Sequence, residues 1–289
     1  MTKWVLAVDG GGTKTALRLY NPEGCIVEQS QGAGSSLSYD LSASCHSIIS
    51  QSEALLTRAN VNVNDAEIVV GVAGATNLEA RNVLQEKLQQ CGFTHVLVVS
   101  DALTSAYGAN LGEPVACVAI GTGSVGMRLL ADGSTHLVGG WGFLLGDEGS
   151  GARLGALLIQ ALMSAIDSAW PITGVLGALV ECIGSDRASI NQWVANASVA
   201  DFAQLSELPW QYHGQCQYAD DVLSKHIQAV EALIKRTRAN FDLPVVLLGG
   251  LAHNTAPLLS RECQQMVQPA KGFALDGAYM LAKSKNRWN

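Results

Sequence analysis

Two stretches of the chain share one pattern, in which a short apolar strand runs into a glycine-rich turn and the chain returns as a second strand. The first stretch begins at Leu6 and reads LAVDGGGTKTALRLYNPEG, and the second begins at Cys117 and reads CVAIGTGSVGMRLLADG. Each continues through a polar turn into another short strand. Because this unit recurs after about 110 residues, the chain is predicted to be an α/β protein built from two duplicated domains.

The similarity continues downstream of both turns. Residues 68–74 form an apolar run that ends in glycine and precedes a helical stretch at 78–91. Residues 245–250 precede a comparable stretch at 255–267. The two halves therefore share more than the glycine turn.

A mainly helical insertion interrupts the second half at residues 151–241. We expect an N-terminal domain over residues 1–112, which the last helix at 273–285 could rejoin. The C-terminal domain, over residues 113–289, contains the insertion and is the larger of the two.

The composition excludes several classes of protein. With 48% hydrophobic and 15% charged residues, the chain can bury a large core and is not disordered. A net charge of −7 without a basic run argues against a nucleic-acid partner. Seven dispersed cysteines without a Cys-x-x-Cys pair, and six scattered histidines, indicate neither a disulfide framework nor a zinc site.

No segment of the sequence is predicted to enter a membrane. The most apolar stretch, residues 154–166, is interrupted by Gln160 and is shorter than the roughly 20 residues of a spanning helix. The first residues reach an Asp and three glycines before the apolar region of a signal peptide could form. We therefore expect a cytoplasmic protein with no membrane partner.

Glycine-rich turns expose consecutive backbone N–H groups that can close around phosphate oxygens. One such turn in each half could hold a polyphosphate from both sides, although either turn alone could be a simple hairpin. Neither the P-loop nor the dinucleotide fingerprint matches the first turn, because a strand rather than a helix follows it. Hydroxyl donors could come from Thr13, Thr15, Thr122 and Ser124. The turn residues expected to bind ATP are Gly11, Gly12, Thr13, Lys14, Gly121, Thr122 and Gly123.

Two aspartates follow apolar strands. Asp9 is either a turn-forming residue or a ligand that holds Mg²⁺ beside the phosphates, directly or through water. Asp101 is either the N-cap of a helix that runs through Tyr107 or a general base for a substrate hydroxyl. We favour the metal ligand for Asp9 and the general base for Asp101.

The densest glycine cluster, GGWGFLLGDEGSG at residues 139–151, carries two adjacent acidic residues ahead of a predicted helix. A flexible backbone with carboxylates favours a polyol-binding loop over a plain flexible connection. Trp141 either stacks on a sugar or anchors this loop. The pair Gly249-Gly250, between a strand and a helix, is either a simple turn or a seat for adenosine.

Together these motifs resemble the actin-like superfamily of sugar kinases and heat-shock ATPases, over nearly the whole chain. The segment at 139–151 is similar to the signature of the BadF/BadG/BcrA/BcrD-type ATPases and the N-acetylglucosamine kinases, and the chain looks most like bacterial glucosamine kinases. The resemblance implies an α/β fold of duplicated actin-like ATPase (ribonuclease H-like) domains. A mixed central sheet is expected in each domain, and a cleft between them.

The resemblance also implies roles for particular residues. Asp101 would be the base for the sugar 6-hydroxyl, and Thr13, Thr122 and Gly249, with Gly250, would contact ATP. Relatives that act on N-acetylglucosamine have an Asn in the loop after the first hairpin, where this chain has Ser36. The implied sugar contacts are Ser36, Asp101, Gly140, Trp141, Gly142 and Asp147.

These expectations describe an ATP- and Mg²⁺-dependent kinase that converts glucosamine to glucosamine 6-phosphate, with domains that close on the sugar. N-acetylglucosamine stays open as the substrate because Ser36 replaces the Asn. The rivals are an ATPase that activates a redox partner and a sugar-responsive regulator. The first carries an iron–sulfur cluster on cysteines, for which no comparable pair is evident, and Asp101 speaks against the second. The oligomeric state stays open, and the apolar helical insertion is compatible with a homodimer.

Overall fold

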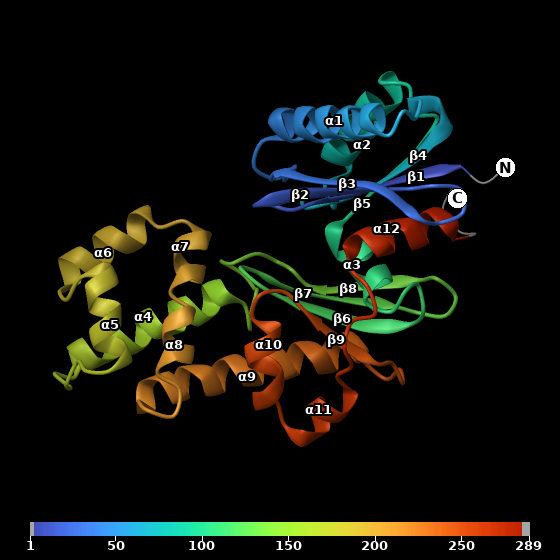
Figure 1. Cartoon of the computed structure of the whole chain (residues 1–289). Coiled ribbons are helices and arrows are strands. Elements are labelled where there is room, and N and C mark those ends of the chain that lie inside the picture. The colour runs from blue at the N-terminus through green and yellow to red at the C-terminus, as the bar shows by residue number, and fades with distance from the viewer. Residues whose placement is uncertain (1–2, 285–289) are drawn as a thin grey trace. The chain divides into compact units, whose positions relative to one another are not determined.

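The structure, a computed structural model, describes residues 3–284 and divides into two compact units. Unit 1 holds the described residues up to 115, residues 129–135 and the described residues from 270 onward. Unit 2 holds residues 116–128 and 136–269. Each unit is built around one β-sheet (Figure 1), so the prediction of an α/β protein with two sheets is confirmed.

Unit 1 contains a five-stranded sheet in the order β3-β2-β1-β4-β5. The strands are β1 (Trp4–Gly10), β2 (Lys14–Tyr20), β3 (Ile26–Ala33), β4 (Ala66–Val72) and β5 (His95–Val99). β1 pairs antiparallel with β2 and parallel with β4, and β4 pairs parallel with β5. Every residue of the AEIVVGV strand β4 is buried, as expected for an apolar strand covered on both faces.

Helices cover both faces of this sheet (Figure 1). α1 (Leu41–Arg58) and α2 (Leu78–Gln90) lie on one face, and α3 (Asp101–Ala109) and α12 (Ala274–Lys283) lie on the other. A short 3₁₀ turn, η1 (Val63–Asp65), precedes β4. Side-chain N-caps from Asp40, Asn77 and Ser100 begin α1, α2 and α3. The helix predicted at 273–285 ends at Lys283, and residue 285 lies outside the described residues.

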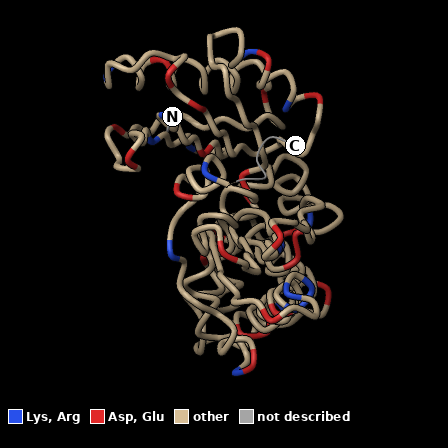
Figure 2. The backbone as a smooth tube through the Cα atoms, turned by 90° about the vertical axis from the view of Figure 1, so that its right-hand side faces the viewer, with Lys and Arg blue, Asp and Glu red and all other residues tan. Residues whose placement is uncertain are grey.

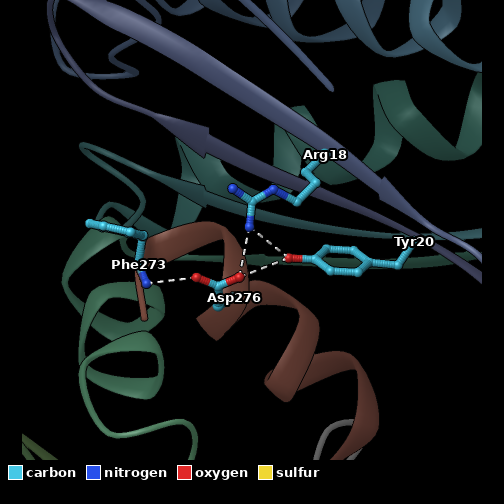
Figure 3. Close-up of polar contacts among 4 residues, drawn as sticks. All are labelled: Arg18, Tyr20, Phe273 and Asp276. Atoms are coloured by element: carbon cyan, nitrogen blue, oxygen red, sulfur yellow. Dashed lines mark hydrogen bonds and ion pairs between the residues drawn. The ribbon is translucent and has the colours of Figure 1, made fainter. Parts of the chain in front are cut away.

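α12 is attached to β2 by one carboxylate. Arg18 Nη1 and the Tyr20 hydroxyl donate to Asp276 Oδ1 at 2.7 and 3.0 Å (Figure 3). Asp276 Oδ2 accepts the Phe273 backbone N–H at 2.8 Å, which caps the start of the helix (Figure 3). Tyr20 also stacks on Tyr279, with 4.2 Å between the ring centroids. The last helix of the chain is therefore anchored to its second strand.

Unit 2 repeats the strand arrangement of unit 1. Its sheet has the order β8-β7-β6-β9, with β6 (Val115–Ile120), β7 (Ser124–Leu129), β8 (Thr135–Gly139) and β9 (Val245–Leu248). β6 pairs parallel with β9, as β1 does with β4. A single parallel bridge between Val245 and Val267 stands where unit 1 has the pairing of β4 with β5. The duplication predicted from the glycine turns is confirmed by this matching strand order.

Helices fill the segment between β8 and β9. They are α4 (Gly151–Asp167), α5 (Val175–Ile183), α6 (Arg187–Asn196), α7 (Val199–Gln204), α8 (Glu207–Gln211) and α9 (Gln217–Arg238). Their apolar faces form a core of their own, with Leu158, Leu162 and Leu179 fully buried. α4 begins at the N-cap Ser150, at the end of the glycine-rich loop, so the insertion starts at a candidate functional segment.

The segment after β9 differs from the prediction of one helical stretch at 255–267. It forms α10 (Ala252–Thr255), the 3₁₀ turn η2 (Ala256–Leu258) and α11 (Arg261–Met266). Pro257 lacks the N–H that a continuing helix needs, and Leu259 takes an extended conformation. Ser260 then caps a new helix by accepting the Cys263 N–H.

Charged residues of both signs are dispersed along the chain (Figure 2). Among residues 3–284, no helix combines the length and the apolar character that crossing a bilayer requires. All seven cysteines are free thiols, and three of them are buried.

Candidate functional site

The two candidate catalytic aspartates lie in unit 1 at the carboxyl ends of parallel strands. Asp9 is near the end of β1, and Asp101 begins α3 directly after β5. Between them runs β4, where Gly71 pairs with Asp9 on one side and Val99 on the other. The charge of Asp101 acts on Asp9, so the structure brings the two carboxyl groups near each other.

Both carboxyl groups have raised pKa values. Burial, and then the charge of Asp101, raises the pKa of Asp9 to about 6, and the charge of Lys14 opposes this. Burial also raises the pKa of Asp101, against hydrogen bonds from backbone N–H groups that lower it. A carboxylate with a raised pKa is a stronger base, which suits proton abstraction near neutral pH.

The alternative that Asp101 caps its helix is wrong. Ser100 is the N-cap, because its Oγ accepts the Leu103 N–H at 3.3 Å. Asp101 Oδ1 accepts the neighbouring Ala102 N–H at 2.9 Å, and no side chain among residues 3–284 donates to the Asp101 carboxylate. One oxygen of Asp101 is therefore available for a substrate proton.

A glycine fixes the position of the helix that carries Asp101. Thr104 Oγ1 donates to the Asp101 backbone carbonyl at 3.0 Å, which closes the first turn of α3. A Cβ on Gly71 would lie only 2.2 Å from that same Thr104 oxygen. Because Gly71 has no side chain, Thr104 packs directly on β4 and sets Asp101 at the strand ends.

The two glycine turns are closed in the same way. The Gly11 N–H donates to the Lys14 carbonyl at 2.9 Å, and the Gly121 N–H donates to the Gly123 carbonyl at 2.9 Å. Gly11 and Gly121 therefore hold their turns in shape. The N–H groups left without a backbone acceptor among the described residues are those of Gly12, Thr13, Thr122 and Gly123.

Two of the four hydroxyls expected to serve as phosphate donors are used inside the protein. Thr15 Oγ1 donates to the Ala33 carbonyl at 2.7 Å and is completely buried. Ser124 Oγ donates to the Glu148 carbonyl at 2.9 Å. The prediction for these two hydroxyls was wrong, because alternation places them on the inner side of their strands. Thr13 and Thr122 remain candidates.

Ser36 lies in a loop that is held against the end of β4. It forms a parallel bridge with Ala73, and its carbonyl accepts Ser44 Oγ at 2.9 Å. Only 7% of Ser36 is exposed, so this candidate sugar contact stands in a rigid part of unit 1.

Unit 2 contains a cavity of about 610 Å³ at its glycine turn. Its wall includes Gly121, Thr122 and Gly250 from the predicted ATP-binding set. Gly249 packs on the end of β6 instead. Its φ is +94°, and a Cβ added to it would lie only 2.3 Å from the Ile120 carbonyl oxygen. A Cβ on Gly250 would meet nothing within 4 Å, so Gly250 faces open space.

The start of α4 holds the second turn in place. The Gly151 N–H donates to the Gly121 carbonyl at 2.7 Å, and the Ala152 N–H donates to the Thr122 carbonyl at 3.2 Å. These first N–H groups of α4 are thus satisfied by the turn itself. The remaining N–H groups of the turn stay available for a ligand.

Asp147 joins the glycine-rich loop to this turn. Backbone N–H groups of Gly142 and Ser124 donate to its carboxylate and lower its pKa, although burial outweighs them and leaves the pKa raised. Asp147 is 9% exposed, has a φ of 57°, and lies so close to Gly123 that a Cβ there would be 2.9 Å from its Oδ2. Gly140 has a φ of 71° and Gly142 one of 83°, in the left-handed region that favours glycine.

Phe143, rather than Trp141, anchors the loop. Trp141 is 77% exposed, and Leu144 and Leu145 are exposed further. Phe143 packs on Phe202 of α7, with 4.9 Å between the ring centroids. The sequence analysis missed Phe143, although an apolar residue inside a glycine-rich loop is the signal that could have found it.

The residues in unit 1 suit a magnesium ion, although no group of three or more His, Cys, Asp or Glu side chains within 3–284 could hold a metal by itself. Mg²⁺ is usually bound by one or two carboxylates, and phosphate oxygens and water complete its shell. Asp9 is such a carboxylate, largely withdrawn from solvent, and a divalent cation bound to it would relieve its repulsion with Asp101.

The structure thus forms two groups of candidate residues, each within one unit. Unit 1 contains Asp9, Gly11, Gly12, Thr13, Lys14, Ser36 and Asp101, and unit 2 contains Gly121, Thr122, Gly123, Gly140, Trp141, Gly142, Asp147, Gly249 and Gly250. The chemistry of the first group suits proton transfer and cation binding. The second group, with free N–H groups at a cavity, suits an anionic ligand with a bulky body.

Comparisons with known proteins agree on the kind of protein. A glucosamine kinase GspK from Vibrio cholerae is 27% identical over 96% of this chain and 95% of its own. An N-acetylmuramic acid/N-acetylglucosamine kinase from Clostridium acetobutylicum is 26% identical over 57% of this chain and 55% of its own.

Solved structures extend the comparison to the fold. A putative N-acetylglucosamine kinase from Chromobacterium violaceum has a TM-score of 0.87 and 30% identity, and the match covers 98% of this chain and 99% of that one. A glucokinase of the ROK family from Streptomyces griseus, at 18% identity, shares the fold with a TM-score of 0.56 over 95% of this chain and 97% of its own. The actin-like fold predicted from the sequence is therefore confirmed.

The family model for the BadF/BadG/BcrA/BcrD ATPases matches residues 6–274, which include both glycine turns, both aspartates and the glycine-rich loop. The strand order of the two units and the solved relatives agree with that match. The chain belongs to the BadF/BadG/BcrA/BcrD ATPase family.

Proposed function

We propose that this protein is a kinase that transfers the γ-phosphoryl group of ATP to the 6-hydroxyl of an amino sugar, with glucosamine as the first candidate. Relatives that match the chain are named as kinases of glucosamine or N-acetylglucosamine, and the family supports the use of ATP. The observation that carries the proposal is the free oxygen of Asp101, on a half-buried carboxylate whose own helix is capped by Ser100.

In the proposed reaction, Asp101 orients the 6-hydroxyl of the sugar and accepts its proton. The hydroxyl oxygen attacks the γ-phosphorus, the bond from that phosphorus to the β–γ bridging oxygen breaks, and ADP leaves. Positioning and charge stabilisation supply most of the catalysis in such transfers. Mg²⁺, held by Asp9 directly or through water, would neutralise charge on the phosphate oxygens when bound.

The phosphates are assigned to the free N–H groups and side chains of the two turns. In the first turn these are Gly12, Thr13 and Lys14, and in the second they are Thr122 and Gly123, with Gly11 and Gly121 closing the turns. Gly249 and Gly250 are assigned to the adenosine. This arrangement uses the cavity of unit 2 for the nucleotide.

The sugar is assigned to Ser36 and Asp101 in unit 1 and to the glycine-rich loop in unit 2. In the loop, Gly140, Trp141 and Gly142 offer backbone groups and an exposed ring. Asp147 supports the loop through its bonds from Gly142 and Ser124, so we assign it to shaping the sugar site as well as to contacting sugar.

Two other activities compete with this proposal. N-acetylglucosamine is the second candidate substrate, because several relatives are named for it. An ATPase that activates a redox partner is less favoured, because the relatives that are 27% and 30% identical over most of the chain are named as kinases.

Substrate choice is tested by ADP release with MgATP against glucosamine, N-acetylglucosamine, glucose and no sugar. We expect the highest kcat/KM with glucosamine and little ADP without sugar. 6-Deoxyglucosamine is the matched control, because it keeps the amine and lacks the acceptor hydroxyl. ADP release that is equal with and without sugar would refute the kinase, and turnover of 6-deoxyglucosamine would refute the 6-hydroxyl.

A further inference from the structure

One wall of the unit 2 cavity consists of polar side chains that the proposed phosphoryl transfer leaves without a role. Glu207 and Gln211 come from α8, and Asn254 comes from α10. The side chains of these three residues make no hydrogen bond or ion pair with any other residue in the part of the chain described. All three are exposed and line this cavity, and Glu207 and Gln211 also line a neighbouring cavity beside Gln204.

A buried network holds this wall in place. The Trp210 ring meets the His226 ring edge-on, with 5.6 Å between centroids and an angle of 89°. His226 Nε2 is 3.0 Å from Thr255 Oγ1, and both of these residues are buried. The network joins α8, α9 and α10, so the helices that carry Glu207 and Asn254 are fixed to each other.

The order of residues along α8 gives the wall a direction. Ser206 lies beside the glycine turn at Gly121, since a Cβ on Gly151 would be 3.2 Å from both Ser206 Oγ and the Gly121 carbonyl oxygen. Glu207 follows, and Gln211 stands one turn beyond it on the same side of the helix, about 6 Å further along the axis. Along α8 from Ser206, the helix therefore presents a carboxylate first and an amide second.

We infer that α8 determines which nucleoside the protein accepts, with Glu207 bound to the ribose hydroxyls and Gln211 to the base. The inference rests on the proposed function for placing the phosphates at Gly121 and Thr122. A carboxylate only accepts hydrogen bonds, and the ribose 2′- and 3′-hydroxyls are the donors that follow the phosphates in a nucleotide. The same chemistry pairs acidic residues with ribose in dinucleotide sites.

The Gln211 amide has an NH₂ group that donates and, beside it, a carbonyl oxygen that accepts, and this pair matches an edge of adenine. Adenine offers an exocyclic amine beside a ring nitrogen acceptor, whereas guanine offers two acceptors along the corresponding edge. The Gln211 amide can therefore both accept a hydrogen bond from adenine and donate one to it. On the corresponding edge of guanine, the amide can only donate. This predicts preference for ATP over GTP through Gln211, and for ATP over 2′-deoxy-ATP through Glu207.

The test compares ATP, 2′-deoxy-ATP and GTP as phosphoryl donors for wild type, Glu207→Ala and Gln211→Ala. We expect wild type to favour ATP over 2′-deoxy-ATP by about tenfold or more in kcat/KM. Glu207→Ala should bring this ratio close to one by weakening ATP, which loses two hydroxyl contacts, more than 2′-deoxy-ATP, which loses only the contact of its 3′-hydroxyl. Gln211→Ala should lower only the ratio of ATP to GTP. Gln204→Ala, on the neighbouring helix and outside this cavity, should leave both ratios unchanged.

Calorimetric titration with ADP and 2′-deoxy-ADP, without sugar, separates this inference from the proposed function. If ADP binds with the expected ratio while no sugar is phosphorylated, the nucleoside assignment stands and the kinase proposal falls. The nucleoside assignment is overturned if sugar is phosphorylated but Glu207→Ala lowers kcat/KM equally for ATP, 2′-deoxy-ATP and GTP. It is also overturned if Glu207→Ala lowers kcat/KM for none of them. A failure of ADP to bind the wild type would overturn it too.

Discussion

At the residue scale, His226 is a buried side chain whose charge the fold excludes. It is 1% exposed, and burial lowers its pKa from 6.5 to about 4. Its Nδ1 has no hydrogen-bond partner among the described residues, whereas Nε2 pairs with Thr255. A proton on this ring would place an uncompensated charge in the buried network beside the unit 2 cavity.

This burial predicts an acid-sensitive stability. Between pH 6.5 and pH 4 the unfolded chain binds a proton at His226 and the folded protein does not, so the histidine lowers stability as pH falls through that window. Between pH 7.5 and pH 5, the free energy of unfolding should fall by about 2 kcal/mol more in wild type than in His226→Gln. Urea unfolding at both pH values measures this difference.

His253→Gln, on the exposed side of α10, is the control. Parallel pH profiles of the free energy of unfolding for wild type and His226→Gln would contradict the prediction.

Sequence patterns indicated which residues are candidates for the site, but not which of them cap a helix or anchor a loop. Asp9, Asp101 and the glycine turns follow apolar strands, and strand ends can be read from the sequence. The choice of Ser100 over Asp101 as the helix cap could not be predicted, because both residue types cap helices. The choice of Phe143 over Trp141 as the loop anchor depends on packing against Phe202, which lies 59 residues further along the chain than Phe143.

At the element scale, α3 and α12 pack through glycines. A Cβ on Gly277 of α12 would lie 1.9 Å from the Thr104 carbonyl oxygen, and a Cβ on Gly108 of α3 would lie 2.0 Å from the Phe273 carbonyl oxygen. The two helices approach each other at backbone distance. Since Thr104 also bonds to the Asp101 carbonyl, this contact bears on the position of the proposed base.

Gly277→Ala should therefore destabilise the protein and slow catalysis. We expect a loss of about 3 kcal/mol or more in the free energy of unfolding, because backbone atoms on the facing helix cannot move aside. Gly177→Ala is the matched control in α5, where the added Cβ meets nothing nearer than 3.9 Å. That variant should gain about 0.5–1 kcal/mol from helix propensity. Urea unfolding of both variants makes the comparison, and equal stabilities would refute this packing.

The carboxylate of Asp276 gives a second prediction for α12. Asp276→Ala removes the acceptor of Arg18, Tyr20 and the Phe273 N–H together, and leaves a partly buried guanidinium without its charge partner. We expect a loss of about 2–3 kcal/mol. Asp167→Ala, which breaks the exposed pair with Arg187, is the control and should leave the unfolding midpoint nearly unchanged. Thermal or urea unfolding distinguishes the two, and a midpoint for Asp276→Ala equal to that of the control would contradict the anchoring role.

At the scale of the whole molecule, the duplication made the fold predictable. Matching motifs at Leu6 and Cys117 fixed the order of strands in both sheets, because a repeated sequence folds into a repeated unit. The places where the halves differ were not predictable in the same way. In unit 2 the fifth strand is reduced to a bridge at Val267, and Pro257 breaks the preceding helix.

The insertion also limited what the sequence could reveal about the site. α7 and α8 are six and five residues long, too short for a clear helical period. Residues of both helices nevertheless line the unit 2 cavity, among them Glu207 and Gln211. The sequence analysis found the glycine turns of that cavity and missed its opposite wall.

The central claim is that Asp101 is the base of an amino-sugar kinase. The most direct test incubates wild type and Asp101→Asn with MgATP and glucosamine, follows ADP release, and identifies the phosphorylated sugar by ³¹P NMR. We predict glucosamine 6-phosphate as the wild-type product. In the variant, kcat should fall about 10²- to 10⁴-fold, with the KM for ATP and the unfolding midpoint nearly unchanged. Phosphorylation of glucosamine by Asp101→Asn at the wild-type rate would contradict the account.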